Sequence, residues 1–129
     1  MTDDLGKALD GAADAWRRAF RREMEGQGLS AGAASELLTH LPAAGLPQTA
    51  LTQRAGLSKQ AVQQLLDQLE AEGLVRREID AADKRARQVR LTAAGQRHLE
   101  LRHEVRDRLA VQIEERLGKK LSAKLDKAL

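Results

Sequence analysis

The chain has 129 residues, a formal net charge of +3 and no cysteine, and aromatic residues make up only 2% of it. This length suffices for a domain with its own core, which must be built mainly from Leu, Ala, Val and Ile. The lack of cysteine excludes a disulfide framework, a thiolate zinc site and a thiol-based redox sensor. No apolar run approaches the ~20 residues of a membrane-spanning helix. Because the acidic start Met1–Asp4 also lacks the layout of a signal peptide, we expect a cytoplasmic protein with no membrane partner.

The N-terminal part of the sequence predicts two helices. Apolar residues over Leu5–Met24 recur at intervals of three and four, which is typical of an amphipathic helix, and Gly26 is expected to end it. A second helix is predicted over Ser30–Leu41, because Pro42 cannot continue it.

A helix–turn–helix is predicted next. A short helix over Gln48–Ala55 leads into the turn Gly56–Ser58 and a longer helix over Lys59–Glu72, which Gly73 ends. The apolar face of the longer helix is formed by Val62, Leu65, Leu66 and Leu69. The side chains expected to point away from that face are Gln60, Gln63, Gln64 and Asp67.

Two β-prone segments, Leu74–Asp80 and Arg87–Thr92, then predict a hairpin with a charged tip over Ala81–Ala86. Alternation along the strands places four residues on the inner face, namely Val75, Ile79, Val89 and Leu91. The hairpin carries six basic residues, Arg76, Arg77, Lys84, Arg85, Arg87 and Arg90, against three acidic ones. Basic charge on a projecting hairpin suits phosphates that flank a groove, although a solvated surface hairpin is the alternative.

A long helix is predicted to begin near Ala93 with Thr92 as its N-cap. Gly118 is expected to interrupt it, so that Lys119–Leu129 forms a last helix. The terminal helices carry apolar stripes outside the winged part, which predicts a two-fold dimer in which the terminal helices of both chains interlock. The alternative is that these helices pack onto their own winged part.

The predicted fold class is mainly α with a small β-hairpin wing (α+β). It is a winged helix–turn–helix with N- and C-terminal dimerisation helices, in one domain of residues 1–129. In this division, residues 42–92 form the winged helix–turn–helix, and residues 1–41 and 93–129 form the dimerisation helices.

Three segments of the sequence resemble the MarR family of transcriptional regulators: LSKQAV at residues 57–62, LEAEGLV at 69–75 and DAADKRARQVRLTAAG at 80–95. The resemblance implies a homodimer whose recognition helices enter successive major grooves of a pseudo-palindromic operator and whose wings reach the neighbouring minor grooves. Many members release DNA when a small, often aromatic anion binds between the dimerisation helices and the winged part. The implied function is a sequence-specific regulator binding double-stranded DNA and acting as a ligand-responsive repressor.

The residues predicted to bind DNA are Ser58, Lys59, Gln60, Gln63, Gln64, Lys84, Arg85 and Arg87. Ser58 either caps the longer helix or donates to a phosphate. Lys59 suits a phosphate or a guanine edge, and a glutamine amide pairs with adenine through both of its polar atoms. The resemblance implies that Arg85 enters the minor groove, while Asp80 or Asp83 holds a wing arginine. The family often has a small hydroxyl residue followed by Arg where this chain has Gln63 and Gln64, so no relative's operator preference transfers.

The candidate effector contacts are Trp16 and Phe20, although their spacing of four positions on one helix favours a role as core residues. His98 and His103 lie five positions apart, about 140° around a helix, so one helix cannot offer both to one ion. We expect no metal, apart from a site across the dimer, and no cofactor. No nucleophile, base or phosphate-binding loop indicates an enzyme. Two other functions stay open: a winged-helix protein-interaction module, and a constitutive DNA-binding protein without an effector.

Overall fold

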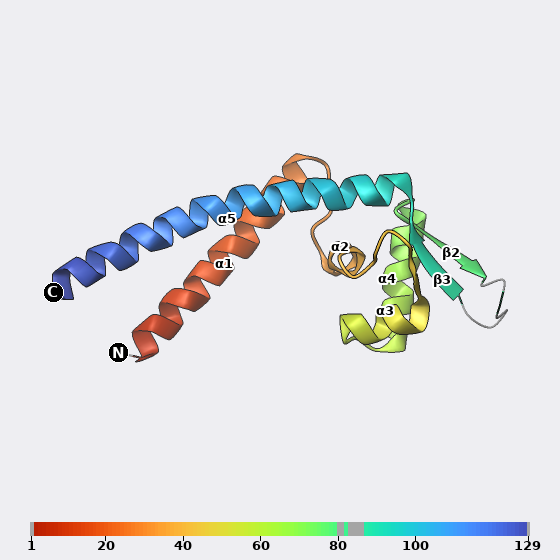
Figure 1. Ribbon diagram of the computed structural model, residues 1–129, viewed down its shortest axis with the longest axis horizontal. Helices are drawn as coiled ribbons and strands as arrows, with labels where there is room; N and C mark the ends of the chain where they lie inside the picture. Colours follow the sequence, from red (N-terminus) through yellow and green to blue (C-terminus); the bar gives the residue numbers. More distant parts are fainter. Residues whose placement is uncertain (1, 80–81, 83–86, 129) are drawn as a thin grey trace. The chain divides into compact units, whose positions relative to one another are not determined.

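The computed structural model describes residues 2–79, 82 and 87–128. Within them the chain forms two compact units. Unit 1 contains the chain up to Gly28 and from Arg102 onward, and unit 2 contains Leu29–Leu101. The elements in chain order are α1 Thr2–Gly26, α2 Ala33–Leu38, β1 Leu46–Pro47, α3 Gln48–Ala55, α4 Lys59–Ala71, β2 Val75–Ile79, β3 Arg87–Leu91 and α5 Ala93–Ala128 (Figure 1). The fold is mainly α with a small antiparallel sheet, as the sequence predicts.

Unit 1 pairs the C-terminal half of α1 with the later turns of α5. Four apolar side chains are buried there: Phe20 and Met24 from α1, and Val105 and Leu109 from α5. An ion pair with a distance of 3.7 Å joins Arg108 to Glu23. The apolar stripe predicted on α1 is therefore buried only near its C-terminal end, because Leu5 and Leu9 are 57% and 56% exposed.

Unit 2 has its core around α4 (Figure 1). Its fully buried members come from α2, α3, α4 and two strands of the sheet: Leu37 and Leu38 from α2, Leu51 from α3, Val62, Leu66 and Leu69 from α4, and Val75 and Val89 from β2 and β3. Each helix thus turns one apolar stripe toward the same centre. Unit 2 includes α2 and the first turns of α5, as well as the predicted winged part.

The sheet has three strands in the order β1-β3-β2, all antiparallel. The two-residue strand β1 was not predicted. Gly45 precedes it with φ +82°, and a Cβ at this position would lie 2.8 Å from the Val89 carbonyl oxygen, so β1 approaches β3 closely only with glycine here. At the far end of the sheet, Ile79 is 69% exposed. Its predicted place on the inner face was wrong, because the buried core ends before this pair of the hairpin.

Two predicted helix boundaries were also wrong. The helix α2 spans only Ala33–Leu38, because the next three residues close tighter turns with i−3 hydrogen bonds, such as that from the Leu41 N–H to the Leu38 carbonyl. The predicted break at Gly118 is absent, since α5 runs continuously from Ala93 to Ala128. Glycine in a helix interior costs only about 1 kcal/mol relative to alanine, which is too little to end a long helix. No helix in the described part of the chain has the length and apolarity required to cross a membrane.

Candidate nucleic-acid interface

The turn between α3 and α4 sets the start of the candidate recognition helix. Gly56 ends α3 in the left-handed conformation with φ +67°. Ser58 then takes an extended conformation, and its Oγ accepts a hydrogen bond of 3.1 Å from the Ala61 N–H. The predicted capping role of Ser58 is confirmed, and it fixes the first turn of α4 without a contribution from a ligand.

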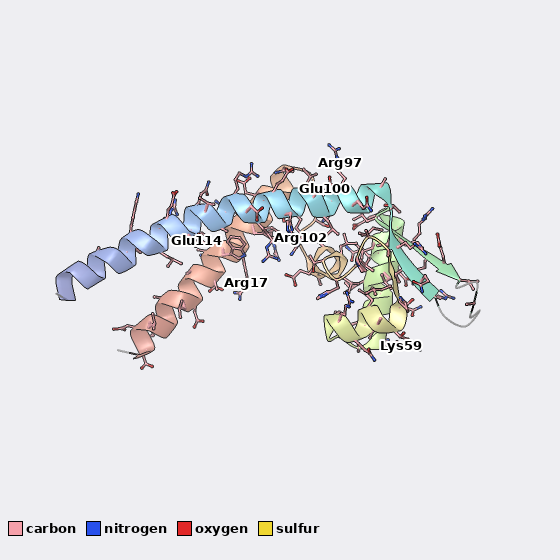
Figure 2. The ribbon with its side chains drawn as sticks, viewed as in Figure 1. Arg17, Lys59, Arg97, Glu100, Arg102 and Glu114 are labelled. Carbon is pink, nitrogen blue, oxygen red and sulfur yellow. The ribbon has the colours of Figure 1, made fainter. Side chains whose placement is uncertain are left out.

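The two faces of α4 differ as the sequence predicts. Its apolar face is buried in unit 2, whereas Lys59, Gln60, Gln63 and Gln64 are all exposed. Lys59 lies beside the turn between α3 and α4 (Figure 2). Gln63 accepts a 3.3 Å hydrogen bond from Gln48 Nε2 at the start of α3, so its amide is partly occupied. Within the described residues, the side chains of Gln60 and Gln64 make no hydrogen bond and keep their donors and acceptors available.

The C-terminal half of α4 is linked to the wing by a cluster that the sequence did not reveal. Arg77 on β2 directs Nη2 toward Asp67 Oδ1 at 2.5 Å and Glu70 Oε1 at 3.0 Å. Glu70 Oε2 also accepts from the Arg77 backbone N–H at 3.2 Å. Asp67 points away from the core as predicted, but it is an ion-pair partner. These hydrogen bonds lower the pKa of Glu70 and raise that of Arg77.

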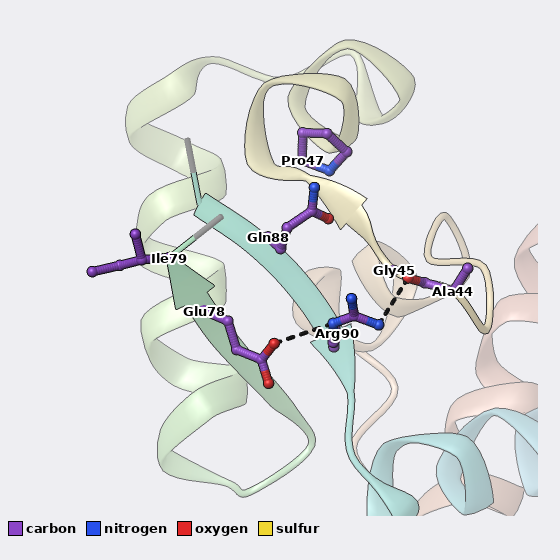
Figure 3. A pocket seen from close by; sticks show the side chains of 7 residues that line it. All are labelled: Ala44, Gly45, Pro47, Glu78, Ile79, Gln88 and Arg90. Atoms are coloured by element: carbon purple, nitrogen blue, oxygen red, sulfur yellow. Dashed lines mark hydrogen bonds and ion pairs between the residues drawn. The ribbon is translucent and has the colours of Figure 1, made fainter. Parts of the chain in front are cut away.

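The outer face of the wing carries a second charged group. Arg90 pairs with Glu78 at 3.2 Å and donates a hydrogen bond of 3.1 Å to the Ala44 carbonyl (Figure 3). Together with Gln88, these side chains line a polar cavity of about 500 Å³ between the sheet and the loop before β1. Arg90 therefore ties the wing to that loop.

Only part of the predicted wing site can be located. Arg87 is exposed at the start of β3. Lys84 and Arg85, which were predicted to contact DNA, lie outside the described residues, as do Asp80 and Asp83. Arg90, a wing arginine at the base of the hairpin, is held by Glu78.

The N-terminus of α5 is fastened to the end of α4. Thr92 Oγ1 accepts a hydrogen bond of 3.0 Å from the Gly95 N–H, which confirms the predicted N-cap. The same hydroxyl donates to the Gly73 carbonyl at 2.6 Å, just after α4. The Thr92 hydroxyl thus links Gly73, just after α4, to the first turn of α5.

Trp16, Phe20 and His98 lie in packed surroundings, whereas His103 is exposed. The rings of Trp16 and Phe20 stack with centroids 6.2 Å apart, and the Arg102 guanidinium lies 4.7 Å from the Phe20 centroid. His98 is only 3% exposed, with Nε2 at 2.8 Å from Ser35 Oγ. Among the described residues, no group of three or more His, Asp or Glu side chains is arranged to hold a metal ion.

Comparison with known proteins agrees with this geometry. A family model described as MarR family matches residues 27–86, a segment that begins before α2 and runs through β2. The transcriptional regulator HosA of Escherichia coli is 49% identical over 55 residues, which are 43% of this chain. The matched part spans only 41% of that protein's length.

Solved structures resemble the chain over nearly its whole length. A cysteine-to-serine mutant of MarR from E. coli complexed with operator DNA has a TM-score of 0.73 at 23% identity, covering 98% of this chain and 94% of that one. A mutant of MepR from S. aureus bound to an oligodeoxyribonucleotide has a TM-score of 0.69 at 22% identity, covering 99% and 95%. YusO from Bacillus subtilis has a TM-score of 0.71 at 22% identity, covering 99% and 96%. At these identities, the likeness establishes the fold.

The capped recognition helix, the three-stranded wing and the matching structures define a winged helix–turn–helix protein. Residues 27–86 match the MarR family model, and the fold of the chain is similar to that of MarR from E. coli.

Proposed function

We propose that this chain is a transcription regulator that binds double-stranded DNA in a sequence-specific manner through α4 and the wing. The observation that carries the proposal is a row of three exposed side chains at the start of α4, those of Lys59, Gln60 and Gln64. Lys59 supplies charge for a phosphate or a guanine edge, and Gln60 and Gln64 supply amides suited to adenine. The opposite face of α4 is buried in the core of unit 2, and this packing holds the helix that carries the three side chains.

We also propose that the regulator acts as a homodimer on a pseudo-palindromic operator. In unit 1, Leu5, Leu9 and Val111 are each more than half exposed. Apolar side chains exposed along long terminal helices favour a covering partner, and a second copy of the chain would supply the same helices. Two recognition helices related by a two-fold axis would then require half-sites about one helical turn apart.

Ligand-responsive repression is the further part of this proposal, and it rests on the family resemblance. Trp16 and Phe20 remain the proposed effector contacts. Phe20 is buried, whereas Trp16 is only partly buried. An effector that reaches Phe20 would therefore have to displace neighbouring side chains of unit 1.

A salt titration of DNA binding tests the proposed function. Binding is measured by fluorescence anisotropy with a labelled duplex of about three helical turns. We expect the logarithm of the affinity to fall linearly with the logarithm of salt concentration, because each phosphate contact releases counterions. A protein-interaction module would show no such binding. A constitutive DNA-binding protein would show it but would keep its affinity when candidate effectors are added.

A further inference from the structure

Arg77 is the most buried member of the ion-pair cluster at the candidate interface. Its side chain is only 10% exposed, whereas those of Asp67 and Glu70 are 60% and 43% exposed. A single nitrogen, Nη2, contacts both carboxylates. The positive charge therefore lies beneath the surface, and the two negative charges lie at the surface.

The position of Asp67 on α4 gives this arrangement a consequence for DNA binding. Asp67 follows Gln60 by seven residues, which is two helical turns with an offset of about 20°. It also lies three residues beyond Gln64. Asp67 is therefore on the same stripe as the glutamines that the proposed function assigns to base contacts. An uncompensated carboxylate on that stripe would repel the phosphates of a bound duplex.

The backbone contact adds a geometric role. The Glu70 carboxylate accepts from the Arg77 N–H on β2, which is an edge strand of the sheet. The cluster thus attaches the first wing strand to the C-terminal half of α4. Because the wing and the recognition helix must contact neighbouring grooves together, their relative placement bears on DNA affinity.

We propose that Arg77 is a positioning residue for DNA recognition. Its side chain is an internal counterion that neutralises Asp67 and Glu70 at the interface, while its backbone N–H joins β2 to Glu70 on α4. The inference rests on the proposed function and names a residue that does not itself touch DNA. A purely structural ion pair would stabilise unit 2 without any specific link between the two carboxylates and DNA affinity.

The test compares five proteins with the labelled duplex at one salt concentration: the parent, Arg77→Gln, Arg77→Lys, Asp67→Asn/Glu70→Gln and the triple variant. Removing Arg77 alone should weaken binding at least tenfold, about 1.4 kcal/mol, since the charges of Asp67, on the glutamine stripe, and of neighbouring Glu70 are then uncompensated. Removing the carboxylates as well should restore the affinity to within about threefold of the parent, or about 0.7 kcal/mol. Arg77→Lys, which keeps the charge, should stay within the same limit. Thermal unfolding of each variant checks that unit 2 is folded.

The outcomes separate the inference from the proposed function. If the parent binds DNA and Arg77→Gln binds it with the same affinity, the inference is overturned but the proposed function stands. A triple variant as weak as Arg77→Gln also overturns it, because the loss would then come from packing. If Arg77→Gln does not fold, Arg77→Lys and the carboxylate double variant decide instead: a tenfold loss in either one contradicts the inference. A parent that shows no salt-dependent binding overturns the proposed function as well.

Discussion

Gly95 packs directly against the backbone of Leu74, because a Cβ on Gly95 would lie 2.0 Å from the Leu74 carbonyl oxygen. The same carbonyl accepts a hydrogen bond of 3.1 Å from the Thr92 N–H. Leu74 joins α4 to β2, so this contact fixes the start of α5 to the corner between the recognition helix and the wing. The sequence pattern Leu-Thr-x-x-Gly, which spans residues 91–95 at the end of the wing segment, therefore has a packing cause.

Gly95→Ala is expected to destabilise the protein by about 1–3 kcal/mol or more, because the added methyl group meets backbone rather than a flexible side chain. The free energy of unfolding from chemical denaturation measures the effect. Gly118→Ala is the matched control, since it lies in the same helix and an added Cβ meets nothing within 4 Å. It should be neutral or stabilising by up to about 1 kcal/mol. Equal effects at the two positions would contradict the packing argument.

Ser58→Ala is expected to lower stability by about 1 kcal/mol, because the Ala61 N–H loses its partner at the start of α4. Ser58→Asp separates the capping role from DNA binding. Aspartate also caps helices, so stability should be kept, while its charge near the phosphates should weaken DNA binding. Denaturation and anisotropy are measured on both variants. If Ser58→Asp bound DNA as tightly as the parent, Ser58 would lie away from the phosphates.

Replacing Lys59 or Gln64 by alanine should impair DNA binding in two different ways. Lys59→Ala should weaken binding to all duplexes alike and reduce the salt slope by about one, as expected for one lost phosphate contact. Gln64→Ala should leave the slope unchanged and reduce discrimination at one base pair by about 1–3 kcal/mol. Affinities for a set of single-base operator variants distinguish these patterns. If Lys59→Ala lost more affinity for some operator variants than for others, Lys59 would contact a base edge and not a phosphate.

The Glu70–Arg77 contact predicts a pH dependence of stability. The side-chain hydrogen bond from Arg77 is the largest cause of the lowered pKa of Glu70, whose ordinary value is 4.5. A carboxyl group with a depressed folded-state pKa stabilises the fold above its unfolded value, and this contribution disappears as the pH falls through the folded value. Glu70→Gln should therefore lose less stability than the parent below about pH 4.5. The difference should be small, because solvent screens a side chain that is 43% exposed. If the parent and Glu70→Gln lost the same free energy of unfolding at acid pH, this prediction would be contradicted.

Much of unit 2 could be predicted from local patterns. The burial of Val62 and Leu66, the cap at Ser58 and the cap at Thr92 follow from helical spacing and capping chemistry, which depend on near neighbours in the sequence. The strand β1 could not be predicted, because two residues carry no periodic signal. The exposure of Ile79 also could not be predicted, because alternation assigns a face to a residue but does not tell where the core beneath it ends.

The remaining differences come from contacts over longer distances. Asp67 looks like another polar residue on the exposed side of α4, and only the folded wing brings Arg77 to it ten positions away. The fully buried Ser35 similarly meets His98 across 63 positions. Gly118 is a different case, because the cost of one glycine is too small to interrupt a long, cooperative helix.

Selection of bound sequences from a random pool of duplexes tests the central claim most directly. We expect the full chain to enrich a pseudo-palindrome whose half-sites lie about one helical turn apart. The enriched duplex should bind at least about a thousandfold more tightly than random DNA at the same salt concentration. A pool without an enriched motif, or a single half-site bound by one copy of the chain, would contradict the proposal of a dimeric, sequence-specific regulator.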